Sequence, residues 1–148
     1  MLMEIDKLRR IAECCLSGRM LDNELSSWLG RSLEAYLARE VSSLEAALGL
    51  RFAKGGVPWW LEERIRQRDA ALRGLARRCF GAVSVTERAR EIHRLARRYA
   101  ASAWRFDSQA ADMPDGYQGT VKEWLWQAFK SGASMPLSER QLRNIFAD

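Results

Sequence analysis

The chain has 148 residues, of which 47% are hydrophobic and 29% are charged, and its formal net charge is +5. This length and composition are typical of a folded globular protein and argue against a disordered chain, and no apolar run approaches the roughly 18 residues that a membrane-spanning helix needs. The N-terminal sequence MLMEIDKLRR carries charges where a secretory signal would be apolar, so we expect a cytoplasmic protein without a membrane partner.

The positive charge is concentrated in the middle of the chain. Residues 1–54 hold eight basic and eight acidic side chains, whereas residues 62–106 hold twelve arginines against five acidic residues. Of the 24 basic residues in the chain, 20 are arginine. Arginine suits the recognition of phosphate and carboxylate groups, although a GC-rich coding sequence would produce the same bias.

Apolar residues recur at spacings of three and four along almost the whole chain, which predicts an all-α protein, a compact bundle of about five to six helices. The first helix is expected to end at Gly18, and Asp22 is expected to cap the second. The apolar stripe of this second helix consists of Leu25, Leu29, Leu33, Leu37 and Val41. We expect the stripe to be buried, and it either continues through Leu44 or breaks where Ser42 begins a capping box.

Two long helices are predicted between Pro58 and Phe106. The first begins at Pro58 and stops at Gly81, and a capping box of Ser84 and Glu87 begins the second. The apolar positions of this second helix alternate by three and four: Ala89, Ile92, Ala96, Tyr99, Ala103 and Phe106. The regular spacing predicts an antiparallel partner in the same fold, and the preceding helix is the expected partner.

Residues 107–119, DSQAADMPDGYQG, are rich in acidic and turn-forming residues and are predicted to be a linker or loop. They separate an expected helical core domain, residues 1–106, from a C-terminal helical pair, residues 120–148, which packs on the core or is appended to it. Capping boxes are predicted for both helices of the pair, Thr120 with Glu123 and Ser138 with Gln141, and Leu137 is expected to staple onto Leu142.

The sequence favours neither catalysis nor a metal or cofactor. The three cysteines are Cys14, Cys15 and Cys79; we expect them to be buried, small apolar residues, and the only histidine, His93, to be solvated. The aspartates at 107, 112 and 115 lack the spacing of a calcium loop and are expected to form turns and end a helix. We predict no catalytic residue, no metal ligand and no cofactor.

Nucleic-acid binding is favoured first by an arginine stripe on the second long helix. Its members, on the side roughly opposite the apolar positions, are Arg90, Arg94, Arg97, Arg98 and Arg105. Such a stripe can follow a line of phosphates and displace their counterions. The alternative is a solvated face stabilised by pairs between Glu87 and Arg90 and between Glu91 and Arg94.

A second candidate is the row formed by Lys122, Trp126 and Lys130, which are spaced by four on one helix. An aromatic ring between two amines can stack on a base or lie along a nucleic-acid backbone. The alternative is that Trp126 packs on a neighbouring part of the protein and the lysines extend around it into solvent.

The third candidate is the C-terminal pair itself, VKEWLWQAFK followed by ERQLRNIFAD. With Leu142 and Ile145 facing inward, Arg140, Arg143 and Asn144 point outward, and arginine suits guanine whereas asparagine suits adenine. The stretch LSERQLRNIF resembles the second-helix start of some bacterial helix-turn-helix regulators, which implies that this helix reads bases in the major groove. The connection SGASMP is longer than is usual for that motif.

The segment GGVPWWLEERIRQRDAALRGLARR, together with the ending, is similar to helical proteins of GC-rich bacterial genomes, some of them near mobile elements. That resemblance implies either a regulator or a protein that disables a host or phage machine. We predict a non-catalytic, DNA-associated regulatory protein. The alternative is an interaction module or inhibitor that binds a protein partner, such as a nucleic-acid enzyme, through Trp59, Trp60 and Trp126, because tryptophan and arginine dominate binding hot spots. A homodimer is left open.

Overall fold

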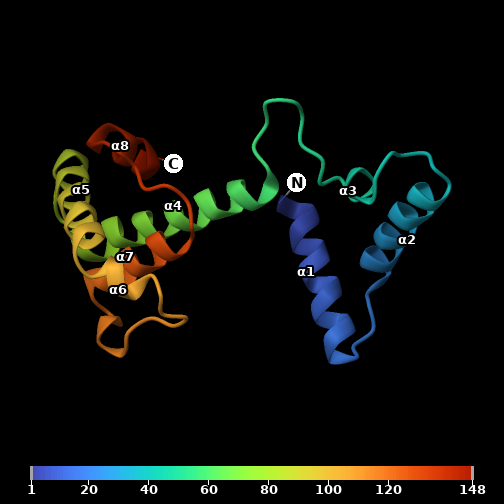
Figure 1. Ribbon diagram of the computed structural model, residues 1–148, viewed down its shortest axis with the longest axis horizontal. Helices are drawn as coiled ribbons and strands as arrows, with labels where there is room; N and C mark the ends of the chain where they lie inside the picture. Colours follow the sequence, from blue (N-terminus) through green and yellow to red (C-terminus); the bar gives the residue numbers. More distant parts are fainter. Residues whose placement is uncertain (1, 148) are drawn as a thin grey trace. The chain divides into compact units, whose positions relative to one another are not determined.

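The computed structural model describes residues 2–147, and every regular element in them is a helix. These residues form eight α-helices and one short 3₁₀-helix (Figure 1). The all-α prediction is confirmed, and the helix count exceeds the expected one because α3 (Leu44–Ala47) and α6 (Trp104–Asp107) are single turns, too short to show apolar periodicity. None of the helices in this part of the chain has the length and apolarity needed to span a bilayer.

The chain divides into two compact units, the first ending at Trp60 and the second beginning at Leu61. The first contains α1 (Leu2–Ser17), α2 (Asn23–Leu37) and α3. As predicted, α1 ends before Gly18, which has a φ of 66°, and the Asp22 carboxylate caps α2 by accepting a hydrogen bond from the Leu25 backbone N–H at 2.8 Å. The core of this unit consists of Ile5, Leu48 and Leu50, with Leu8, Trp28, Leu29 and Trp59 packed against them.

The apolar stripe of α2 is buried only at its start. Leu25 is 2% exposed, whereas Leu33 and Leu37 are 40% and 78% exposed. The prediction of a buried stripe is therefore wrong, because the small core of this unit covers only part of the helix. The helix ends at Leu37, and the next turn, α3, is capped by Ser43 instead of Ser42.

The second unit combines most of α4 (Trp59–Phe80) with α5 (Val85–Ala101), α6, the 3₁₀-helix η1 (Asp115–Tyr117), α7 (Val121–Lys130) and α8 (Glu139–Ala147). Four of these helices share one core, made of Ala71, Leu72, Leu75, Ala76, Ala89, Ile92, Tyr99, Leu125, Ala128, Leu142 and Ile145. Both C-terminal helices therefore belong to the same packed unit as α4 and α5. This division of the chain differs from the predicted boundaries at residues 106 and 119.

The helix that packs most extensively against α5 is α8, which lies beside it in Figure 1. The expectation that α5 pairs chiefly with α4 is wrong, because the two helices diverge from the short connection between them (Figure 1). Arg88, in the first turn of α5, closes this connection. Its guanidinium donates hydrogen bonds to the carbonyl oxygens of Phe80 and Gly81 at 2.7 and 3.0 Å. These two carbonyl groups at the end of α4, which lack partners within the helix, thereby gain hydrogen bonds.

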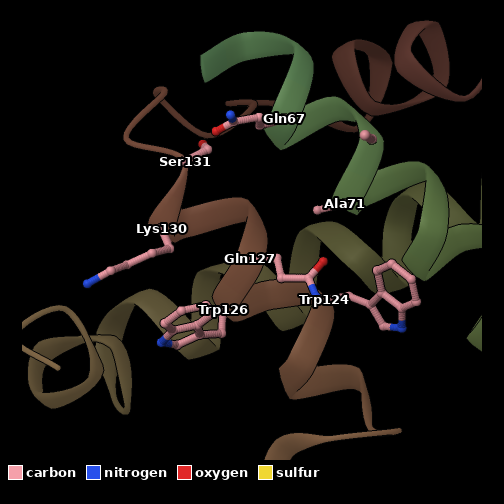
Figure 2. A pocket seen from close by; sticks show the side chains of 8 residues that line it. Gln67, Ala71, Trp124, Trp126, Gln127, Lys130 and Ser131 are labelled. Carbon is pink, nitrogen blue, oxygen red and sulfur yellow. The ribbon is translucent and has the colours of Figure 1, made fainter. Parts of the chain in front are cut away.

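Close packing of α4 and α7 depends on Gly74. A Cβ atom added there would lie 2.3 Å from Cζ3 of Trp124, so only glycine allows the indole ring to approach α4 this closely. Figure 2 shows Trp124 on α7 beside Ala71 on α4, at a shallow pocket of about 440 Å³.

The segment after α5 is more closely integrated into the second unit than a linker would be. The helix ends at Ala101 instead of Phe106, and Phe106, predicted to continue the buried face, is 79% exposed. Asp107 is 9% exposed at the end of α6. Tyr117 of η1 packs against the core. The predicted linker thus supplies side chains to the interior of the unit.

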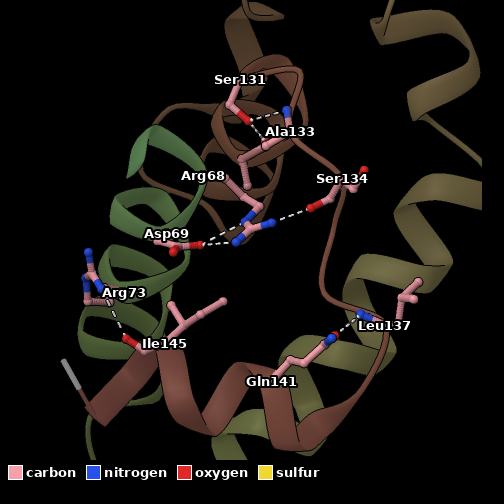
Figure 3. Close-up of polar contacts among 10 residues, drawn as sticks. Arg68, Asp69, Arg73, Ser131, Ala133, Ser134, Leu137, Gln141 and Ile145 are labelled. Carbon is pink, nitrogen blue, oxygen red and sulfur yellow. Dashed lines mark hydrogen bonds and ion pairs between the residues drawn. The ribbon is translucent and has the colours of Figure 1, made fainter. Parts of the chain in front are cut away.

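Two arginines of α4 hold α8 and the loop before it, as Figure 3 shows. The Arg68 guanidinium pairs with the Asp69 carboxylate at 2.7 Å and donates to the carbonyl oxygen of Ser134. Arg73 donates to the carbonyl oxygen of Ile145 at 3.2 Å, in the last turn of α8. These contacts use two of the twelve arginines in the basic segment for structure.

Candidate nucleic-acid interface

The helix α5 separates apolar and basic side chains sharply. Ser84 caps it as predicted, because its Oγ accepts a hydrogen bond from the Glu87 backbone N–H at 3.3 Å. Ile92 and Tyr99 are 0% and 4% exposed, so this face is committed to the core of the second unit. The arginines on the other side of the same helix are exposed: Arg90, Arg94, Arg97 and Arg98.

Three of these four arginines are available for a ligand. The Arg94 guanidinium pairs with the Glu91 carboxylate at 2.8 Å, one of the two pairs considered from the sequence. The guanidinium groups of Arg90, Arg97 and Arg98 make no hydrogen bond or ion pair with residues 2–147, so the pair between Glu87 and Arg90 is not formed there. Unpaired, exposed guanidinium groups in one row suit the phosphates of a nucleic acid.

Arg105 does not extend this row. It is exposed, but it lies on α6, beyond the end of α5 at Ala101. The predicted stripe assumed one continuous helix. The backbone leaves the helical path at Ser102, where φ is −121° and ψ is −97°. The rotation of 100° per residue therefore no longer places Arg105 on the same side as the arginines of α5.

The helix α8 begins with a modified capping box. Ser138 Oγ accepts from the Gln141 backbone N–H at 3.3 Å, and Gln141 Oε1 accepts from the backbone N–H of Leu137 at 2.6 Å, one residue earlier than the pattern predicts. Leu137 is 85% exposed, so the predicted staple onto Leu142 is wrong. The Leu137 carbonyl oxygen instead lies 3.3 Å from Nε2 of His93, a contact that connects the start of α8 to α5.

The outer side of α8 carries the side chains proposed to read bases. Leu142 and Ile145 are buried, whereas Arg140, Arg143 and Asn144 are exposed and their side chains make no hydrogen bond or ion pair with the described residues. Because α8 packs along α5, the two helices place their exposed basic side chains on one unit. We refer to Arg90, Arg94, Arg97, Arg98, Arg140 and Arg143 as the basic surface.

The arrangement of α7 and α8 differs from the compact pair of a helix-turn-helix. Residues 131–138 separate the two helices, and α8 packs mainly against α5. In the motif, the recognition helix packs on the helix immediately before it after a three- or four-residue turn. Any contact between α8 and bases would therefore rely on α5 for support.

The row of Lys122, Trp126 and Lys130 is engaged within the second unit. Trp126 packs against the core, and the Lys130 amine lies 5.8 Å from its ring centroid while donating to the carbonyl oxygen of Ala110 at 2.6 Å. Figure 2 shows Trp126 and Lys130 at the edge of the pocket beside α4. The Lys122 amine lies over Tyr117 at 5.2 Å. These contacts favour the packing interpretation over base stacking.

The two tryptophans at the end of the first unit differ in exposure. Trp59 packs against the core of that unit, whereas Trp60 is 44% exposed and makes edge contacts with Trp59 and Phe52, at centroid distances of 5.9 and 6.3 Å. Trp59 is only partly buried, and Trp60 is therefore the more accessible tryptophan of the pair.

The cysteines do not have the environment expected of them. Cys15 and Cys79 are exposed and Cys14 is half-buried, so the prediction of three buried thiols is wrong. Cys15 and Cys79 continue the apolar spacing of α1 and α4, four residues after the buried Ile11 and Leu75, but they lie near the ends of these helices and remain exposed. Residues 2–147 contain no group of three or more histidine, cysteine, aspartate or glutamate side chains placed to hold a metal ion.

A buried carboxylate was missed by the sequence analysis. Asp107, predicted to form a turn, accepts hydrogen bonds from the hydroxyl groups of Tyr99 and Tyr117 at 2.7 and 2.8 Å. Burial first, and then the hydrogen bond to Asp107, raise the pKa of Tyr99 far above its usual value. The hydrogen bond to Asp107 raises the pKa of Tyr117 as well. The apolar spacing identified Tyr99 as a core residue, but no local pattern shows which acid its hydroxyl meets.

Comparisons of the chain with protein-family models, with curated proteins and with solved structures found no match. Function is therefore inferred from the surface that the chain itself presents. Its most distinctive feature is the basic surface of α5 and α8.

Proposed function

We propose that the chain is a small DNA-associated protein, regulatory in role, that binds without catalysis. The observation that carries this proposal is the basic surface, in which two packed helices expose six arginines, and five of the six, all except Arg94, make no hydrogen bond or ion pair with the described residues. The second unit has 16 basic and 11 acidic residues, whereas the first has eight of each. The net positive charge of the protein thus belongs to the unit that carries this surface.

The two helices would have different tasks. Arg90, Arg97 and Arg98 of α5 would contact phosphates, which supplies affinity without sequence preference. Arg140, Arg143 and Asn144 of α8 would contact base edges, with arginine on guanine and asparagine on adenine. The other faces of both helices are fixed in one core, so the charged side chains project from a rigid support.

Fluorescence anisotropy of a labelled 25-base-pair duplex of random sequence, titrated at several salt concentrations, tests this proposal. On a duplex of random sequence all six arginines of the basic surface can contact phosphates, and a protein that makes six such contacts should lose on the order of a thousandfold in affinity between 50 and 200 mM salt. Absence of binding at low salt would overturn the proposal.

Paired variants locate the interface. Arg90→Ala with Arg97→Ala should weaken binding and lower the slope of log affinity against log salt by about two. Arg31→Ala with Arg51→Ala removes two exposed arginines from the first unit and lowers the net charge equally. If both pairs weaken binding to the same extent, net charge explains the affinity and the basic surface does not.

A second candidate function rests on Trp60. The proposal is an interaction module or inhibitor that binds a protein partner through this exposed ring, which the edge contacts with Phe52 and Trp59 hold in place. Trp60→Ala should then abolish capture of the partner by the immobilised protein and leave affinity for the duplex unchanged. Equal capture by the variant and the original chain would remove this candidate.

A further inference from the structure

A pocket of about 380 Å³ lies between the last turns of α5 and the first turns of α7, and we call it the α5–α7 pocket. Its floor belongs to the core of the second unit, since Tyr99 and Leu125 are 4% and 2% exposed. Leu95, Ala103 and Val121 complete its apolar lining. Sites for small molecules have volumes of about 300 to 1,000 Å³ and are mostly apolar, so this pocket suits a small organic molecule.

Two positively charged side chains line the same pocket, Arg98 from α5 and Lys122 from α7. Both are exposed, and the Arg98 guanidinium makes no hydrogen bond or ion pair with residues 2–147. The Lys122 amine lies 5.2 Å from the centroid of the Tyr117 ring, a contact that does not neutralise its charge. No acidic side chain of the described residues lines the pocket. Two cations beside an apolar floor are complementary to an anion that carries an apolar group.

Other cavities of the described residues lack this combination. The groove after α2 has Arg39 next to Glu40, and in the pocket at the loop before α8 the Arg68 guanidinium is paired with the Asp69 carboxylate at 2.7 Å. An acid therefore balances the arginine in both. The pocket on the opposite flank of α5, which Arg97 lines, has a volume of only about 240 Å³.

We propose that the α5–α7 pocket binds an amphipathic carboxylate, a small molecule with one carboxylate group and an unbranched hydrocarbon chain. The carboxylate would lie between Arg98 and Lys122, because a guanidinium donates two parallel hydrogen bonds to a carboxylate and an amine adds a further charged donor. The chain would cover Tyr99 and Leu125 and lose its apolar area to the pocket. A nucleotide is a poorer fit, because the mostly apolar lining offers few partners for its polar groups.

Such a ligand would compete with DNA for one residue of the basic surface. Arg98 is among the arginines of α5 proposed above to contact phosphates. A carboxylate held by Arg98 removes that contact and should weaken binding to a duplex several-fold. This regulatory effect rests on the proposed function, whereas binding of the carboxylate does not.

Heteronuclear NMR of the isotope-labelled full chain, titrated with octanoate, tests the proposal. The backbone amide signals of residues 98–103 and 121–125 should shift and saturate, with a dissociation constant on the order of 1 mM for so small a ligand. Two matched compounds separate the contributions, since acetate lacks the chain and octan-1-ol lacks the charge. At the same concentration each should produce much smaller shifts than octanoate.

Removing the two cations tests the position of the carboxylate. Arg98→Gln with Lys122→Gln should raise the dissociation constant for octanoate by roughly tenfold or more, because both charged donors are lost. The matched control is Arg66→Gln with Arg77→Gln, which removes two exposed arginines of α4 that do not line the pocket and lowers the net charge equally. This control should bind octanoate like the original chain.

Filling the pocket tests the position of the hydrocarbon chain while both cations remain. Ser102 is exposed and lines the pocket, so Ser102→Phe places a ring in it without replacing a core residue. The variant should lose octanoate binding. Far-UV circular dichroism of each variant shows whether the second unit remains folded.

Four results would overturn the proposal. The first is the absence of saturable shifts in residues 98–103 and 121–125, and the second is shifts spread over both units, which would indicate non-specific adsorption. Equal binding of acetate or octan-1-ol would mean that chain and carboxylate are not bound together. Equal weakening in the control variant would attribute the affinity to net charge.

The duplex titration, repeated with octanoate, tests the regulatory effect. Octanoate should weaken duplex binding by the original chain more than the same concentration of acetate does, and it should have no such effect on Arg98→Gln with Lys122→Gln. If the original chain binds no duplex, the proposed function fails and the NMR titration still decides whether the ligand binds. If the chain binds a duplex but octanoate causes no shifts, only the carboxylate proposal fails.

Discussion

Gly74 shows how a single residue without a side chain determines the packing of a helix pair. The Trp124 ring occupies the space that any other side chain would need. Gly74→Ala should raise the intrinsic preference of α4 for the helix by about 1 kcal/mol, yet we expect a net loss of about 2 kcal/mol in the free energy of unfolding of the second unit because the ring must move. Urea denaturation followed by circular dichroism measures both effects together.

The control for this prediction is Gly30→Ala in the middle of α2. No atom lies within 4 Å of the added Cβ, so only the gain in helix preference applies. This variant should be more stable than the original chain by up to about 1 kcal/mol. A gain in stability for Gly74→Ala would contradict the packing seen between α4 and α7.

The buried network around Asp107 has a defined dependence on pH. The pKa values of Tyr99 and Tyr117 are raised above the ordinary value of 10.0, so the folded protein retains protons that the unfolded chain releases. The stability contributed by the two hydroxyl groups is therefore complete below pH 10 and is lost as the pH rises further. At neutral pH it does not vary.

Replacing Tyr99 tests this dependence. Tyr99→Phe should lower the free energy of unfolding by about 2 kcal/mol at pH 7, because the buried carboxylate loses one of its donors. The difference in the free energy of unfolding between the variant and the original chain should become smaller above pH 10. Denaturant titrations between pH 7 and 11.5 would measure this difference. Tyr36→Phe removes an exposed hydroxyl without a partner in the described residues and serves as the control. A constant difference at all pH values would indicate lost packing alone.

At the scale of elements, α8 is held in place largely by groups outside its own sequence. Arg68 binds the loop before it, Arg73 caps its end and His93 contacts the carbonyl oxygen of Leu137. The position of the outward-facing residues of α8 is thus set by α4 and α5. Arg68 and Arg73, which the sequence showed only as part of the basic excess in residues 62–106, therefore support the fold.

Arg68→Ala should loosen the loop and lower the stability of the second unit by about 2 kcal/mol, because the Ser134 carbonyl oxygen and the largely buried Asp69 carboxylate lose their partner. The melting temperature and the rate of proteolysis within residues 131–138 measure the change. Arg66→Ala, an exposed arginine on the same helix, should leave both unchanged. Equal sensitivity of the two variants would contradict the role assigned to Arg68.

Local signals predicted several helix boundaries. Asp22, Ser84 and Ser138 cap the helices that they were expected to begin, because a cap depends on residues within one turn. Thr120 makes no such bond to its helix, and its hydroxyl donates to the Tyr117 carbonyl oxygen at 2.6 Å instead. A competing acceptor outside the helix is invisible to a local pattern.

At the scale of the whole molecule, the two units differ in how much core they bury. Of the five largest side chains that are fully buried, Leu72, Leu75, Ile92 and Leu142 belong to the second unit, and only Leu25 belongs to the first. A unit of about 60 residues has little interior and is marginal by itself. The second unit is therefore expected to be the more stable of the two.

Separate fragments test this expectation. Residues 61–148 should be helical and unfold cooperatively on heating, whereas residues 1–60 should unfold at lower temperature and lower denaturant concentration. Circular dichroism and calorimetry of the two fragments and the full chain provide the comparison. A first fragment as stable as the second would contradict the difference in buried core.

The sequence by itself determined the helical class, several helix caps, the buried face of α5 and the outward positions of Arg140, Arg143 and Asn144, because each follows from side chains within a few residues of one another. Only the tertiary structure decided that Phe106 and Leu37 are exposed, that α5 packs with α8, that Asp107 meets two tyrosines and that Arg68, Arg73 and Arg88 support the fold. These features depend on which apolar side chains a small core covers and on which carbonyl and carboxylate oxygens still need a hydrogen-bond donor. Both depend on contacts between residues that are far apart in the chain.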